Sequence, residues 1–127
     1  MRFIPTWFHG ILDYVVGLAL LFAPEIFRFA SVGGAAVVIP RLLGIVLIVY
    51  SLFTRYELGV FKVIPMGYHL TVDFLAALFL ALSPFLFGFS GMAKNVWMPH
   101  VVVGVVVILV VLCSQTTPGV SVTTPQS

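Results

Sequence analysis

Charge is scarce in this chain of 127 residues, because only 8% of them are Asp, Glu, Lys or Arg, against roughly 25% in an ordinary soluble domain. Hydrophobic residues make up 61% of the chain, and the mean hydropathy is +1.21. The net charge of +2 is small and scattered, which excludes the basic patch that nucleic acid requires. The composition therefore predicts an integral membrane protein with the lipid bilayer as its surroundings.

Cysteine is also nearly absent. The single Cys113 excludes a disulfide within the chain and a metal site built from several of its cysteines. The sequence contains no glycine-rich phosphate loop and no nucleophile elbow, and its serines are not surrounded by a histidine and a carboxylate in any known motif. These absences give no support to an enzymatic activity.

Long apolar runs are present instead, and four of them account for nearly the whole chain: residues 5–29, 33–54, 65–89 and 96–113. Each run is near or above the roughly 20 residues that an α-helix needs to cross about 30 Å of hydrocarbon. The sequence therefore predicts an all-α membrane protein with four transmembrane helices.

A shift of sixty positions, without a gap, aligns the first half of the chain with the second. The shift superimposes identical residues: Ile4 and Ile64, Pro5 and Pro65, His9 and His69, Asp13 and Asp73, Pro24 and Pro84, and Gly44 and Gly104. Apolar residues coincide easily in a membrane protein, but proline, histidine and aspartate do not, so the pattern predicts a tandem repeat. We place one two-helix repeat at 1–60, a second at 61–114, and a disordered polar tail at 115–127. Since each unit holds two helices, we expect two parallel helical hairpins in the same orientation.

Some of the matched residues predict packing. Pro24 and Pro84 should kink or end the first helix of each unit. Gly44 and Gly104 place a small residue in the middle of the second helix, where we expect two helix backbones to approach closely.

The two-helix unit resembles the SPW-repeat family of small bacterial integral membrane proteins. The stretches that carry the resemblance are "FAPEIFRF" and "LSPFLFGF", together with "HGILDY", "YSLFTRYELG", "HLTVDF" and "MPHVVVG". It covers essentially residues 2–113, with "APE" and "SPF" in place of the tripeptide that gives the family its name. The resemblance implies a multi-pass protein of the bacterial inner membrane with a two-by-two layout of helices, and it implies no activity.

The positive charges predict an orientation. Arg2, Arg55 and Lys62 belong to the side of the N-terminus and the central loop, whereas Arg28 and Lys94 belong to the other side. The positive-inside rule therefore predicts that both termini are cytoplasmic.

A histidine and an aspartate recur four residues apart within the apolar runs, in "HGILD" (His9 and Asp13) and in "HLTVD" (His69 and Asp73). Residues i and i+4 share one face of a helix. Asp13 lies about eight residues into its run, roughly 12 Å deep at 1.5 Å per residue, where an ionised side chain that faces lipid costs several kcal/mol. We therefore expect both pairs to face the interior, opposite each other and at one depth.

Two further basic residues follow a proline, Arg41 in "IPRLLG" and His100 in "MPHVVVG". A long arginine side chain can reach along its apolar stem toward a buried carboxylate. We expect Arg41 and His100 to support the polar layer, with Arg41 and a histidine neutralising the two aspartates.

Three functions fit these residues. The layer can be structural, a polar network that locks the bundle or a larger membrane assembly. It can handle ions, with His9, Asp13, His69 and Asp73 binding protons or a divalent metal, although a fixed charge at Arg41 would repel a metal. It can also be a redox site, in which His9 and His69 hold haem b or the site binds a quinone. Since so small a bundle has a narrow interior, we also expect a homo-oligomer, such as a dimer.

Overall fold

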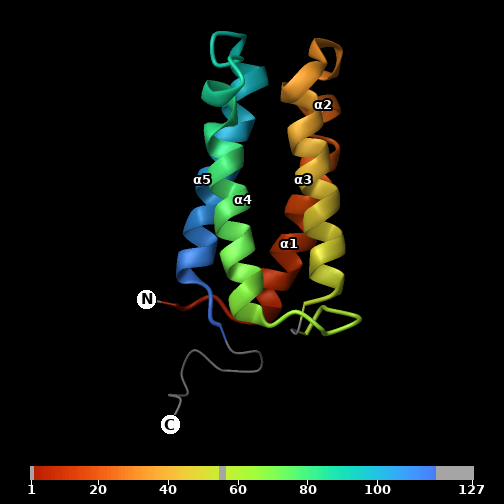
Figure 1. Cartoon of the computed structure of the whole chain (residues 1–127), viewed down its shortest axis with the longest axis vertical. Helices are drawn as coiled ribbons and strands as arrows, with labels where there is room; N and C mark the ends of the chain where they lie inside the picture. The colour runs from red at the N-terminus through yellow and green to blue at the C-terminus, as the bar shows by residue number, and fades with distance from the viewer. Residues whose placement is uncertain (1, 55–56, 117–127) are drawn as a thin grey trace.

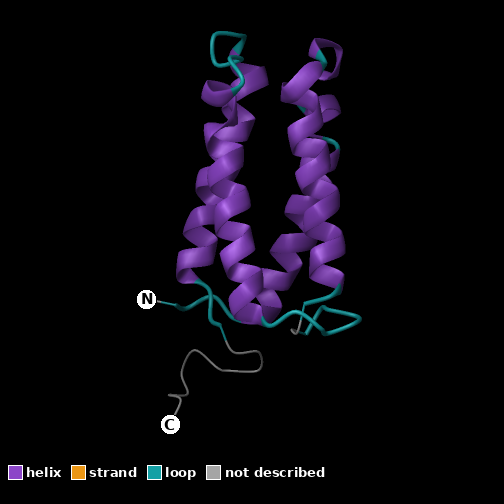
Figure 2. Ribbon diagram, viewed as in Figure 1, coloured by secondary structure: helices purple, strands orange, loops and turns teal. Residues whose placement is uncertain are grey.

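The computed structural model describes residues 2–54 and 57–116 (Figure 1). Arg55 and most of the tail that was predicted to be disordered lie outside these ranges. The described residues form helices and no strand (Figure 2). The elements are α1 (Thr6–Leu21), α2 (Ala23–Ile26), the 3₁₀ turn η1 (Ala30–Val32), α3 (Gly34–Leu52), α4 (Met66–Leu86) and α5 (Lys94–Cys113).

Three of the described helices, α3, α4 and α5, are long and apolar enough to cross a membrane, and α1 is a shorter apolar helix of 16 residues. The predicted all-α fold with membrane-spanning helices is confirmed. The prediction that Pro24 kinks or ends the first helix is confirmed, because α1 ends at Leu21 and α2 begins at Ala23 with Pro24 in its first turn, where a missing N–H costs nothing. Pro84 instead lies inside α4, two residues before its end.

The four long helices form two close pairs, α1 with α3 and α4 with α5, as Figure 1 shows. Contacts between the pairs are fewer and come mainly from α3 and α4. The segment before α1 lies beside the end of α5, since the Ile4 amide donates to the Cys113 carbonyl at 2.8 Å. Leu20, Ile39 and Leu80 form a buried cluster, and Val103 of α5 packs against it.

The two glycines of α3 and α5 lie where helix backbones touch. A Cβ atom at Gly44 would come within 2.5 Å of the Gly17 carbonyl oxygen on α1, and one at Gly104 within 2.7 Å of the Ala77 carbonyl oxygen on α4. The close approach predicted at these positions is confirmed. The small residues thus let α1 pack closely along α3, and α4 along α5.

Two left-handed residues follow α2 and α4 and lie sixty positions apart in the sequence. Arg28 has φ = 60° and Gly88 has φ = 76°. In both places the next amide closes the turn, Phe29 N to Pro24 O at 2.8 Å and Phe89 N to Pro84 O at 2.9 Å. A left-handed backbone suits glycine and costs other residues roughly 1–2 kcal/mol.

Arg28→Gly is therefore expected to raise the free energy of unfolding by about 1 kcal/mol. The matched variant Gly88→Ala should lower it by a similar amount, because it places a Cβ at the equivalent turn. Equilibrium unfolding in mixed micelles measures both. A loss of stability in Arg28→Gly would show that the arginine side chain outweighs the backbone strain.

Candidate functional site

The two histidine–aspartate pairs meet between α1 and α4. His9 and Asp13 lie in the first two turns of α1, and His69 and Asp73 lie in the first two turns of α4. All four residues are buried, with relative exposures between 0% and 6%. The residues that the sequence singled out therefore face each other at one end of the helices, as their spacing predicted.

Each imidazole contacts both carboxylates through Nε2. His9 Nε2 lies 3.1 Å from Asp13 Oδ1 and 3.0 Å from Asp73 Oδ2. His69 Nε2 lies 3.0 Å from Asp13 Oδ2 and 3.0 Å from Asp73 Oδ2. One ligand atom from each of the four residues lies within 4.8 Å of all the others. We call these four residues the His/Asp cluster.

The other ring nitrogen of each histidine contacts a hydroxyl group. His9 Nδ1 is 2.7 Å from Ser114 Oγ, just after α5, and His69 Nδ1 is 2.6 Å from Thr54 Oγ1, just after α3. Ser114 and Thr54 each donate their hydroxyl proton to the carbonyl oxygen four residues earlier, at 2.6 and 2.8 Å. A hydroxyl has only one proton, so each must accept a hydrogen bond from Nδ1. This network assigns a proton to Nδ1 of both rings.

The assignment determines what the cluster presents at its centre. A neutral imidazole that carries its proton on Nδ1 has a lone pair on Nε2. Nε2 of His9, Nε2 of His69 and the oxygens of Asp13 and Asp73 are then all electron-pair donors that point at one another. Such an arrangement is stable only when positive charge, as protons or as a metal ion, lies among them.

The distances also suit a small metal ion. Zinc binds nitrogen and oxygen ligands at about 2.0–2.2 Å, so two ligands of a tetrahedral ion lie roughly 3.3–3.5 Å apart. The four Nε2–oxygen distances of 3.0–3.1 Å are shorter by only a few tenths of an ångström. These distances use both oxygens of Asp13, and one ligand atom from each residue lies within 4.8 Å of the others, so the side chains would have to rotate to hold a single ion.

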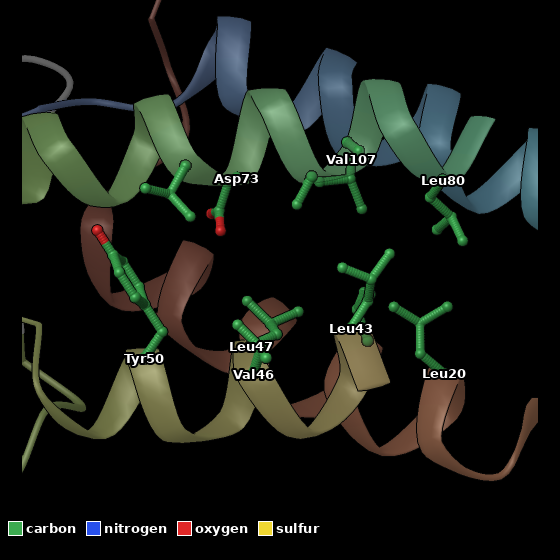
Figure 3. A pocket seen from close by; sticks show the side chains of 12 residues that line it. Leu20, Leu43, Val46, Leu47, Tyr50, Asp73, Leu80 and Val107 are labelled. Carbon is green, nitrogen blue, oxygen red and sulfur yellow. The ribbon is translucent and has the colours of Figure 1, made fainter. Parts of the chain in front are cut away.

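An apolar cleft between α3 and α4 reaches the cluster at Asp73 (Figure 3). Its volume is about 40 Å³, and its other lining residues are aliphatic apart from Tyr50. Figure 3 shows the Asp73 carboxylate pointing into the space between the two helices. The residues that line this cleft carry no positive charge beside Asp73.

Arg41 does not support the cluster, so this expectation was wrong. Its guanidinium binds Glu25 through both oxygens, at 2.9 and 2.6 Å, and contacts the Leu21 carbonyl at 3.3 Å. Arg41 lies in the second turn of α3, at the opposite end of the α1–α3 pair from Asp13. A nearby carboxylate satisfies it there, so its charge does not stand beside the His/Asp cluster to repel a metal.

His100 also lies away from the cluster, so the second supporting role was wrong as well. Its Nε2 donates to the Ala36 carbonyl on α3 at 2.9 Å. Its ring lies 5.6 Å from the ring of Phe29 and 4.8 Å from that of Phe89, measured between centroids. His100 is therefore a buried residue that joins α5 to α3 within an aromatic cluster.

Sequence reasoning missed Thr54 and Ser114. The two hydroxyl residues lie sixty positions apart, the spacing that superimposes His9 on His69, and each follows the last turn of an apolar helix. The shared spacing of sixty positions could have indicated that these two hydroxyl residues play equivalent roles in the two halves.

The comparison with known families agrees with this architecture. The SPW repeat domain matches residues 6–114, which contain all the helices described above. The chain belongs to the SPW repeat family. No curated protein and no solved structure matches it. The family and the apolar helices together identify a multi-pass membrane protein of the SPW repeat type with a buried His/Asp cluster.

Proposed function

We propose that this SPW repeat protein binds a divalent metal ion of the zinc type within the membrane, held by His9, Asp13, His69 and Asp73. The observation that supports the proposal most is the hydroxyl contact at Nδ1 of both histidines. Metal-binding histidines typically donate their other N–H to a neighbouring acceptor in this way, which orients the ring and fixes its tautomer.

The ligand set favours zinc over harder ions. Two imidazole nitrogens and two carboxylate oxygens form a four-ligand set that zinc accepts in tetrahedral geometry. Ca²⁺ takes six to eight oxygen ligands, and Mg²⁺ requires octahedral oxygen coordination, typically with several waters. The two carboxylates also match the charge of a divalent ion, so the occupied site would be neutral in its apolar surroundings.

A structural or proton-binding role is the second candidate, and one observation favours it. Every contact in the cluster between residues far apart in sequence joins α1 to α4, and the two hydroxyl contacts join the same two helix pairs. Protons shared among the four side chains would lock the pairs together without a metal. This candidate uses the same residues, so the experiment has to separate binding from stability.

The haem alternative is not supported by the geometry. Axial histidines would need the porphyrin ring between their Nε2 atoms. Asp13 and Asp73 occupy that space, with oxygens 3.0–3.1 Å from both Nε2 atoms. A quinone would need a binding site beside the cluster, and the described residues there form only the narrow apolar cleft.

We also propose that the chain consists of two parallel hairpin repeats in the bacterial inner membrane, with both termini and the His/Asp cluster on the cytoplasmic side. The repeat is supported by structurally similar residues that lie sixty positions apart: His9 and His69, Thr54 and Ser114, and Arg28 and Gly88. Assembly into a homodimer stays a prediction.

The test is a titration of the detergent-purified protein with Zn²⁺, followed by gel filtration and elemental analysis. We expect one zinc per chain in the wild type and none in the double variant His9→Ala/His69→Ala. His100→Gln is the matched control, because it removes the other buried histidine and should keep the zinc. If the wild type binds no zinc while Asp13→Asn lowers its thermal stability, the structural role is correct and the metal site is not.

A further inference from the structure

A second cavity lies against α4 and α5, next to the segment that precedes α1. Its volume is about 290 Å³, near the lower end of the range for ligand-binding pockets. Apolar side chains form most of its wall: Leu70, Phe74, Leu75, Val111 and Leu112. Arg2 and two threonines, Thr71 and Thr116, add polar groups. None of the residues of the His/Asp cluster lines it.

Arg2 is fixed in place but keeps most of its donors. Its Nη1 atom donates to the Val111 carbonyl at 3.0 Å and to the Ser114 carbonyl at 2.7 Å, at the end of α5. A guanidinium has five N–H groups, and these two bonds use the two on Nη1. Within residues 2–54 and 57–116, no partner is recorded for the remaining three. A positive charge with three donors is therefore held at the cavity.

The equivalent end of the α1–α3 pair carries different side chains at two matched positions. Gly67, at the start of α4, has no atom within 4 Å of the place where a Cβ would lie, whereas Trp7 stands sixty positions earlier on α1. Tyr14 on α1 donates its hydroxyl to the Leu58 carbonyl at 2.8 Å, which holds the loop after α3 against that helix. The residue sixty positions after Tyr14 is Phe74 on α4, and its side chain has no hydroxyl that could hold a loop. Among the described residues, the loop is therefore held by a side-chain hydroxyl on the α1–α3 pair, and α4 has no such hydroxyl at the matched position.

We propose that the cavity binds an anionic phospholipid, with the phosphate group on Arg2 and one acyl chain against Leu70, Phe74 and Leu112. Arg2 lies at the helix ends, the level at which lipid headgroups lie. Among the described residues, the lining of the cavity contains no Asp or Glu to compete for Arg2. The inference does not depend on the metal site, because it uses other residues.

The test is native mass spectrometry of the full chain from mixed micelles with equal amounts of phosphatidylglycerol and phosphatidylcholine. We expect about fivefold more bound phosphatidylglycerol, the effect of one basic residue near an anionic headgroup. Arg2→Gln should abolish this preference. Since that variant also loses two hydrogen bonds at the end of α5, Gly67→Trp is the second variant: it keeps Arg2, copies Trp7 and fills the cavity.

Gly91→Trp is the control, because Gly91 also has open space around it but lies at the other end of the helices. It should keep the full preference, while Gly67→Trp should lower it at least threefold. Equal retention of the two lipids by the wild type would overturn the proposal. So would an unchanged preference in Gly67→Trp, the result expected if the chain's own tail fills the cavity.

Discussion

Ser114→Ala is expected to weaken zinc binding by about 10- to 100-fold. The Ser114 hydroxyl accepts a hydrogen bond from His9 Nδ1 at 2.7 Å and thereby holds the Nε2 lone pair toward the cluster. Without it, the ring is free to take the other tautomer, and Nε2 then carries a proton where the metal would bind. Thr54→Val should have the same effect through His69, since its hydroxyl makes the equivalent contact at 2.6 Å. Competition titration with a chromogenic zinc chelator measures both affinities.

Ser83→Ala is the matched control for these variants. Ser83 is a buried serine whose hydroxyl donates to the Leu80 carbonyl at 2.7 Å, with no recorded contact to the His/Asp cluster. It should lose some stability and keep its zinc affinity. If Ser114→Ala binds zinc as tightly as the wild type, the hydroxyl does not orient the ring. If all three variants lose affinity in proportion to their stability, the effect is structural.

The prediction of the fold from sequence succeeded where a residue's role depends on its own chemistry. Apolar runs near 20 residues predict helices in a bilayer, because a helix of that length spans the hydrocarbon and satisfies each N–H and C=O within its own segment. Gly44 and Gly104 could be placed at close contacts because no other residue allows such an approach. The break beside Pro24 was predicted, but the difference from Pro84 could not be, because the two prolines look alike in sequence while only the first begins a new helix.

The sequence predicted the His/Asp cluster correctly, because the position of those residues follows from their own spacing. It failed for residues whose role depends on which other side chain they contact. The i, i+4 spacing places His9 beside Asp13 on one helix face, whatever the rest of the chain does. Arg41 was assigned to the wrong carboxylate because the sequence gives a residue's depth but not the direction in which its side chain points. Glu25 is its partner at 2.6 Å. Thr54 and Ser114 were missed because a hydroxyl at a helix end usually bonds only to its own backbone.

Gly44→Leu is expected to prevent α1 and α3 from pairing. A Cβ at Gly44 would already lie 2.5 Å from the Gly17 carbonyl oxygen and 2.7 Å from the Leu21 amide nitrogen, and both are backbone atoms that cannot rotate away. Even Gly44→Ala should lower the free energy of unfolding by about 1–3 kcal/mol, the range for overpacked cores. Gly67→Ala is the control. It lies in a helix with open space, so it should be neutral or gain up to about 1 kcal/mol from the better helix propensity of alanine.

The same substitution tests how the site depends on the fold. α1 carries His9 and Asp13, and α3 ends beside Thr54, so separating the two helices would displace half of the His/Asp cluster from the hydroxyl that orients His69. Gly44→Leu should therefore lose zinc binding together with its stability, whereas Gly67→Ala keeps both. Unfolding in mixed micelles and zinc titration of the same samples measure the two effects. A Gly44→Leu protein as stable as the wild type would contradict the close backbone contact, whatever its affinity for zinc.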